Sequence, residues 1–210
     1  MMRRQQTVLE EKLNTWTHGL GAVLGAVGLA LLIVFGKNIT ALDLFSLVIY
    51  GFSIIFLFTA SALYHYVKDE KRKHFFRIID HIGIYVLIAG TYTPVTLIGL
   101  NESIGLQLFV SVWIIAAFGL VIKLFYTGKF EILSTLLYLV MGWLIVFDFS
   151  SLSDVIGNNG VALLFAGGAF YTIGILFYAI DRIPYNHVIW HLFVLAGAIC
   201  HYLMVFLYIA

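Results

Sequence analysis

Charged residues are scarce in this chain, and proline and cysteine are scarcer still. Of its 210 residues, 11% are charged and 62% are hydrophobic, with two prolines and one cysteine. A soluble globular domain is about one quarter charged and about half apolar, so this composition excludes that class. The single cysteine, Cys200, excludes an intramolecular disulfide and a cluster of thiolate ligands. A net charge of +1 without a basic, aromatic-rich pattern gives no indication of nucleic-acid binding.

Long hydrophobic runs take the place of the missing charges, and the mean hydropathy is +1.01. Each run approaches the ~20 residues that a helix needs to cross ~30 Å of hydrocarbon. The alternating segments of about ten residues that a membrane barrel requires are not visible. The sequence therefore predicts an all-α, polytopic membrane protein, a bundle of seven transmembrane helices. The seven runs are Gly19–Phe35, Leu44–Tyr66, Ile78–Leu100, Ile104–Ile122, Ile132–Phe149, Val161–Ile180 and Val188–Ala210.

Positive charges are distributed unevenly between the two sides of such a bundle. If the N-terminus is cytoplasmic, eleven of the twelve Lys and Arg residues fall on the cytoplasmic side, and Lys37 alone falls outside. Cytoplasmic loops are enriched in Lys and Arg, so this bias predicts a cytoplasmic N-terminus and an external C-terminus. The eleven residues are Arg3, Arg4, Lys12, Lys68, Lys71, Arg72, Lys73, Arg77, Lys123, Lys129 and Arg182.

Nothing in the sequence divides the chain, so residues 1–210 are expected to form one membrane domain. The longest expected connections are "VKDEKRKHFFR" after the second run and "SSLSDVIGNNG" after the fifth. Residues 1–17 are expected to form a cytoplasmic or interfacial segment, either an interfacial helix or, at its start, an irregular chain. Pro94 is expected to kink the third helix, because proline removes a backbone donor.

Five polar residues from three helices are expected at one membrane level. His65 ends the second run with Ser61 one turn deeper, Asp80 lies near the start of the third, and His187 and His191 open the seventh at i, i+4. Ionisable residues inside spans are rare and usually face the bundle interior with a partner. All five fall toward the cytoplasmic side in the predicted topology.

This coincidence indicates a metal site. Two histidines at i, i+4 and a third from another helix suit a tetrahedral Zn²⁺ with one position open to water, and three histidines without thiolate favour zinc over other metals. An i, i+4 histidine pair is a weak motif by itself, and the alternative is a set of interfacial histidines that bond to neighbours or headgroups.

The remaining histidines fit this site less well. His201 lies ten residues beyond the pair, hence ~15 Å farther along the helix, and is expected to be a packed histidine. His81 lies about 100° around the helix from the aspartate before it, so at most one of the two points squarely at the site. His18 shares a face with Glu11 and Asn14, and it either supports the site from outside the ligand set or makes a capping or headgroup contact.

Four ordered motifs resemble the haemolysin III family, the bacterial branch of the progestin and adipoQ receptor family. They are "EEKLNTWTH", "SALYH", "DHIGIYVLIAGTYTP" and "HVIWHLFVLAGAICH". The resemblance implies a seven-helix bundle with zinc bound by His65, His187 and His191, and Asp80 and Ser61 near the metal-bound water. It also implies a relation to alkaline ceramidases, in which a similar arrangement hydrolyses lipid amides, and a place in a bacterial cytoplasmic membrane.

Three functions remain open on these grounds. The first is a zinc-dependent hydrolase that acts on an amide or ester of a membrane lipid and serves lipid homeostasis, with Asp80 and Ser61 as catalytic residues. The second is a non-enzymatic sensor or regulator of lipid state, in which zinc is structural. The third is a haemolytic pore, which ranks last because the midplane is nearly all apolar. The expected partners are membrane lipids, and the sequence leaves the oligomeric state and the substrate open.

Overall fold

Helices make up the regular structure throughout the described part of the chain. The computed structural model describes residues 6–36 and 40–210, and no strand occurs in these two ranges. The predicted all-α class is therefore confirmed for the described residues. The elements in chain order are α1 (Val8–Phe35), α2 (Ala41–Tyr66), α3 (Glu70–Pro94), the π-helical turn η1 (Val95–Gly99), α4 (Gly105–Tyr126), α5 (Glu131–Trp143), the 3₁₀ turn η2 (Leu144–Asp148), α6 (Phe149–Ala179) and α7 (Asn186–Tyr208).

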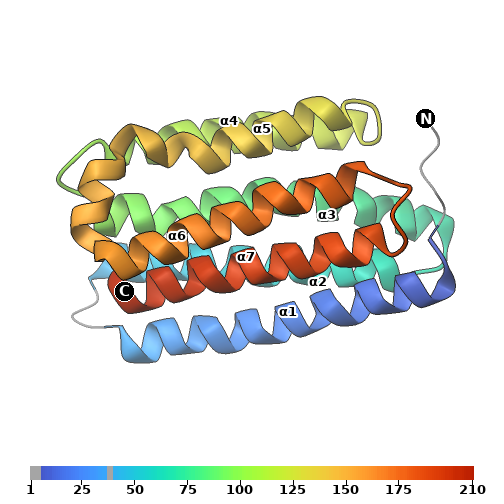
Figure 1. Cartoon of the computed structure of the whole chain (residues 1–210), viewed down its shortest axis with the longest axis horizontal. Coiled ribbons are helices and arrows are strands. Elements are labelled where there is room, and N and C mark those ends of the chain that lie inside the picture. The colour runs from blue at the N-terminus through green and yellow to red at the C-terminus, as the bar shows by residue number, and fades with distance from the viewer. Residues whose placement is uncertain (1–5, 37–39) are drawn as a thin grey trace.

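The long helices lie side by side along the longest axis of the molecule (Figure 1). In this view α4 and α5 form the upper layer, α3 and α6 lie beneath them, and α1 lies at the bottom. Helix α1 packs against both α2 and α7, while α2 also packs against α3 and α6 against α7. Helices that follow one another in the chain alternate in direction, so the start of α1 and the end of α7 lie at opposite ends of the bundle.

Six helical stretches in the described residues are long and apolar enough to cross a membrane. One of them, Glu131–Ala179, is 49 residues long, and it would extend ~74 Å as a straight helix. It folds back instead, and α5 and α6 lie in different layers in Figure 1. Such lengths and compositions, with many apolar side chains on the outside of the bundle, are those of an integral membrane protein.

The expected connection at 150–160 is mostly helical in the structure. Residues of "SSLSDVIGNNG" belong to α6, which is interrupted at Gly157. There φ is +62°, a left-handed conformation that glycine adopts without the steric cost of a Cβ. The Ser, Asp and Asn residues that suggested a loop instead lie in the helical turns around this interruption, so the loop prediction was wrong.

Helix α1 begins eleven residues earlier than the predicted Gly19. Thr7 caps it: its side chain accepts from the backbone N–H of Glu10, and the Glu10 carboxylate accepts from the backbone N–H of Thr7. This reciprocal cap satisfies two donors at the helix start. The segment leading into the membrane is therefore a continuous part of the first helix from Val8 onward, and residues 1–5 lie outside the described residues.

Two glycines bring α1 close to α2. A Cβ at Gly21 would lie 2.8 Å from the ring of Phe58, and one at Gly25 would lie 2.7 Å from Cγ2 of Ile54. A side chain at either position would have to displace a buried neighbour. This close approach holds the buried face of α1, on which Asn14 and His18 also lie, against the rest of the bundle.

Helix α3 also begins earlier than expected. Asp69 caps it by accepting from the backbone N–H of Arg72, so most of the expected connection at 67–77 is helical. Asp80 accordingly lies about three turns into α3 instead of opening it. Pro94 ends the α-helical part and a π-helical turn follows, because proline removes a ladder donor.

Candidate metal centre

Three histidines converge where α2 ends and α7 begins. His65 is the penultimate residue of α2, and His187 and His191 lie one turn apart at the start of α7. Residues at i and i+4 share a helix face, so both α7 rings turn toward α2. One ligand atom from each histidine lies within 4.8 Å of the other two. The structure thus brings together the three histidines that the sequence analysis grouped.

The three rings are almost equally spaced. Ring centroids lie 4.6 Å apart for His187 and His191, 4.9 Å for His65 and His191, and 5.1 Å for His65 and His187. The planes are mutually tilted by 54° to 73°, so the rings do not stack on one another. A triangle of tilted imidazoles around one point is the arrangement that three ligands of a tetrahedral ion adopt.

Two of the ring nitrogens in this triangle lack a protein partner. Nε2 of His65 and Nδ1 of His191 are buried and have no hydrogen bond among the described residues. Buried polar atoms are nearly always paired, and an exception at such a site indicates an ion or ligand. Three imidazole donors without thiolate fit Zn²⁺ and also other transition metals. The residues present therefore fit the metal that the resemblance implies.

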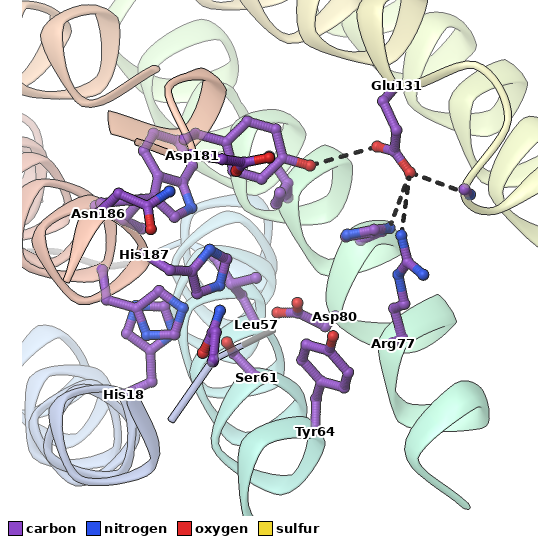
Figure 2. Close-up of a pocket in the computed structure, with 18 of the residues that line it drawn as sticks. His18, Leu57, Ser61, Tyr64, Arg77, Asp80, Glu131, Asp181, Asn186 and His187 are labelled. Atoms are coloured by element: carbon purple, nitrogen blue, oxygen red, sulfur yellow. Dashed lines mark hydrogen bonds and ion pairs between the residues drawn. The ribbon is translucent and has the colours of Figure 1, made fainter. Parts of the chain in front are cut away.

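Asp80 and Ser61 line the same cavity as His187 and His191. Both are buried, with 8% and 1% of their surfaces exposed. Figure 2 shows the Asp80 carboxylate and the Ser61 hydroxyl on the side of the cavity that faces His187. The cavity has a volume of about 1160 Å³, which is large enough for a substrate headgroup beside the histidines.

Glu11 is a neighbour of the triangle that the sequence analysis did not assign to it. Its Oε2 lies 2.7 Å from Nδ1 of His65, and its Oε1 lies 2.6 Å from Nζ of Lys73. The early start of α1 places this carboxylate level with the end of α2. Its spacing with Asn14 and His18 was visible in the sequence, but its partner on another helix was not.

His18 lies directly behind His191. The two rings stack with centroids 3.6 Å apart and planes 8° apart, and the edge of His18 meets Phe58 at 4.9 Å. Both ring nitrogens of His18 are buried without a hydrogen bond in the described part of the chain. His18 thus supports a histidine of the triangle by packing, as one of the two sequence interpretations expected.

A second polar cluster lies across the cavity, around Glu131 at the start of α5 (Figure 2). The Glu131 carboxylate lies 3.0 Å from Nζ of Lys123 and 3.7 Å from Nη2 of Arg77. It also accepts from the Tyr178 hydroxyl at 3.3 Å, and Nδ1 of His81 lies 4.0 Å away. His81 therefore faces Glu131, while Asp80 faces the histidine triangle. Ionisable residues within apolar helices usually pair with an opposite charge, and Lys123 pairs with Glu131 in this way.

A separate, apolar cavity of about 340 Å³ lies deeper in the bundle between α3, α5, α6 and α7. It shares four lining residues with the polar cavity: Leu57, Ile84, Trp190 and Val194. His201 lines its far part, with Nε2 3.2 Å from the Leu164 carbonyl oxygen. His201 thus lies apart from the triangle, as its spacing predicted.

Comparison with known proteins agrees with this arrangement of motifs. The chain is 43% identical over 203 residues to the hemolysin-3 homolog of Bacillus subtilis, covering 96% of this chain and 95% of that protein. It is 40% identical over 210 residues to hemolysin-3 of Bacillus cereus, covering 100% and 96%. It is also 30% identical over 217 residues to the human monocyte to macrophage differentiation factor, covering 99% and 87%. The profile of the family described as haemolysin-III related matches residues 6–202, and the chain belongs to that family.

Proposed function

We propose that this protein is an integral membrane hydrolase that uses Zn²⁺ to cleave an amide or ester bond of a membrane lipid. The observation that carries the proposal is the histidine triangle, of which His187 and His191 line a polar cavity together with Asp80 and Ser61, and this cavity borders an apolar one. A metal with three protein ligands keeps a position for chemistry, whereas a structural zinc normally has four.

In this proposal His65, His187 and His191 hold the zinc. The bound ion supplies a Lewis acid that polarises a carbonyl and makes a water molecule acidic enough to attack near neutral pH. The Asp80 carboxylate orients the attacking water and accepts its proton, as a carboxylate within hydrogen-bond reach can. The Ser61 hydroxyl donates a hydrogen bond to the carbonyl oxygen as negative charge develops on it.

The two adjoining cavities support a lipid as the substrate. The polar cavity suits a headgroup and the scissile bond, and the apolar cavity suits part of an acyl chain. Their shared wall places the change from polar to apolar lining close to the histidines. A ceramide-like amide or an acyl ester has this same division along its length, and its hydrolysis would serve membrane lipid homeostasis.

We further propose seven crossings, with the histidine triangle near the cytoplasmic face of a bacterial inner membrane. Splitting Glu131–Ala179 at its turn gives two crossings, one for α5 and one for α6. All Lys and Arg residues within 6–36 and 40–210 lie at the end of the bundle where α1 begins, and Lys and Arg concentrate on the cytoplasmic side. Arg3, Arg4 and Lys37 lie outside the described residues.

Fusions to the C-terminus test this topology. Alkaline phosphatase fused after Ala210 should be active and green fluorescent protein at the same place should be dark, because the C-terminus is expected outside. The same two reporters fused after Lys129, at the charged end, should give the reverse result. An inactive phosphatase fusion at Ala210, together with a fluorescent green fluorescent protein fusion at the same place, would contradict seven crossings from a cytoplasmic N-terminus.

A lipid-hydrolysis assay tests the chemistry. Purified, zinc-loaded protein is incubated with a bacterial lipid extract, and free fatty acid and lyso-lipid are measured by mass spectrometry. Product should form, and it should disappear in Asp80→Asn and after chelation. The matched control is Asp154→Asn, which removes an exposed carboxylate from α6 and should leave the product yield unchanged.

The same assay separates the enzyme from a regulator with structural zinc. If no lipid is cleaved and chelation lowers only the melting temperature, zinc holds α2 and α7 together without catalysis. That result would contradict the proposed hydrolase function and favour a sensor of lipid state. Release of vesicle contents by the purified protein would instead favour the pore.

A further inference from the structure

The His65 ring is held from the side opposite its unpartnered nitrogen. Its Nδ1 lies 2.7 Å from Oε2 of Glu11, while its Nε2 is buried and has no partner among the described residues. When a carboxylate accepts from one ring N–H, the other nitrogen carries the lone pair. Glu11 therefore fixes both the tautomer and the orientation that His65 needs in order to act as a ligand.

The Glu11 carboxylate is itself fixed from a third helix. Its other oxygen, Oε1, accepts from Nζ of Lys73 on α3 at 2.6 Å. The contacts form one chain, from Lys73 on α3 through Glu11 on α1 to His65 on α2. Both Glu11 and Lys73 are partly buried, with 25% and 30% of their side chains exposed, so solvent screens this chain less than an ion pair on an open surface.

We propose that Glu11 is a positioning residue of the metal centre, which raises metal affinity by orienting the His65 imidazole, and that Lys73 supports it. The inference rests on the proposed function, because it assumes that the histidine triangle binds a metal. Carboxylates that hold a ligating histidine in this way increase the basicity of the ligand and restrict its rotation.

A purely structural role for Glu11 makes a different prediction. A carboxylate that merely ties α1 to α2 and α3 would change the stability of the metal-free protein as much as that of the metal-bound protein. A positioning residue changes the affinity for the metal and the electronic environment of the metal, with a smaller effect on the metal-free fold. These two readouts can be measured separately.

The test uses the full chain purified in detergent. Zinc affinity is measured by competition with a chelator of known affinity, and the absorption bands of bound Co²⁺ report the geometry of the ligands. Glu11→Gln should bind zinc about 10 to 100-fold more weakly and shift the Co²⁺ bands. Lys73→Met should weaken binding less than Glu11→Gln does.

The matched control is Glu102→Gln, the same substitution at an exposed site between η1 and α4. It should leave affinity and spectrum as in the unmodified protein. Gln is close to Glu in size and retains an acceptor oxygen, so Glu11→Gln is expected to fold. Lys73→Met provides a second variant that leaves Glu11 in place.

Unchanged affinity and an unchanged Co²⁺ spectrum in Glu11→Gln would overturn the inference. So would a fall in affinity matched by an equal loss of stability in the metal-free protein. None of these measurements requires a substrate. If the protein cleaves no lipid, yet Glu11→Gln lowers its affinity for zinc, the proposed function is wrong and the inference about Glu11 holds.

Discussion

Each half of α7 contains a histidine that packs inside the bundle, but the surroundings of the two differ: His191 is buried and His201 is half-buried. In the first half, the ring of His191 stacks on His18 and its Nδ1 has no hydrogen bond within the described residues. In the second half, Nε2 of His201 meets the Leu164 carbonyl oxygen. A histidine satisfied by a backbone carbonyl is complete without a ligand, whereas an unpartnered nitrogen beside two other imidazoles points to a metal. The hydrogen-bond partners of the ring nitrogens therefore separate the two histidines of α7 into a candidate ligand and a packed residue.

Exchanging each histidine for glutamine should give the largest contrast between the two halves. His191→Gln should lower zinc affinity by more than the ~100-fold that the loss of an outer hydrogen bond can cost, because it removes a ligand. His201→Gln should bind zinc as the unmodified protein does. Metal content after gel filtration, measured by elemental analysis, checks both. Equal zinc in the two variants would contradict the assignment of His191.

Metal removal should give the next largest effect. Zinc at about a thousand times its dissociation constant adds ~4 kcal/mol of stability, which for a chain of this size corresponds to ~10 °C in melting temperature. Chelation should therefore lower the melting temperature of the unmodified protein and of His201→Gln by similar amounts. His191→Gln should already melt lower, and chelation should change it little. If chelation lowered the melting temperature of His191→Gln as much as that of the unmodified protein, the stabilising metal would be bound elsewhere.

Filling the apolar cavity should leave the metal untouched and alter substrate selection. Gly168 lines that cavity, and a Cβ added there would meet no atom within 4 Å. Gly168→Leu should lower the ratio of long-chain to short-chain lipid hydrolysis by about tenfold, with unchanged zinc content. Gly168→Ala is the matched control and should have a much smaller effect. A loss of zinc in Gly168→Leu would mean that the substitution disturbs the histidines, and an unchanged ratio would exclude this cavity as the acyl site.

The class of the fold and the grouping of the histidines could be predicted from the sequence, because both follow from the spacing of residues within helices and from the positions of the helix ends. Hydrophobic runs of membrane length predicted helices, and the i, i+4 pair with His65 at a helix end predicted convergence. The helix starts were harder to place, since the reciprocal cap of Thr7 and Glu10 extends α1 through polar residues that resemble a leader. The interruption of α6 at Gly157 was likewise hidden, because it depends on one backbone conformation.

The outer partners of the site could not be derived from spacing. Glu11 contacts a residue 54 positions away, and its other contact, Lys73, is 62 positions away. Both contacts depend on how α1 packs against α2 and α3. A useful signal was still present, because a carboxylate and a histidine on one face of an apolar helix are rarely without partners.

The smallest predicted effect lies at the end of the bundle opposite the histidines. There Ser103 donates to Oδ2 of Asp148 at 2.6 Å, which links the α3–α4 connection to η2. Ser103→Ala removes one hydrogen bond to a carboxylate at a site open to water on the Ser103 side, so it should cost about 1 kcal/mol, or ~3 °C in melting temperature. Zinc affinity should not change, because no histidine of the triangle lies near this contact. Parallel melting curves with and without chelator check both statements, since the chelator shift should equal that of the unmodified protein. A reduced shift in Ser103→Ala would show that the two ends are coupled, and the division between a proposed metal-binding end and a structural end would then be wrong.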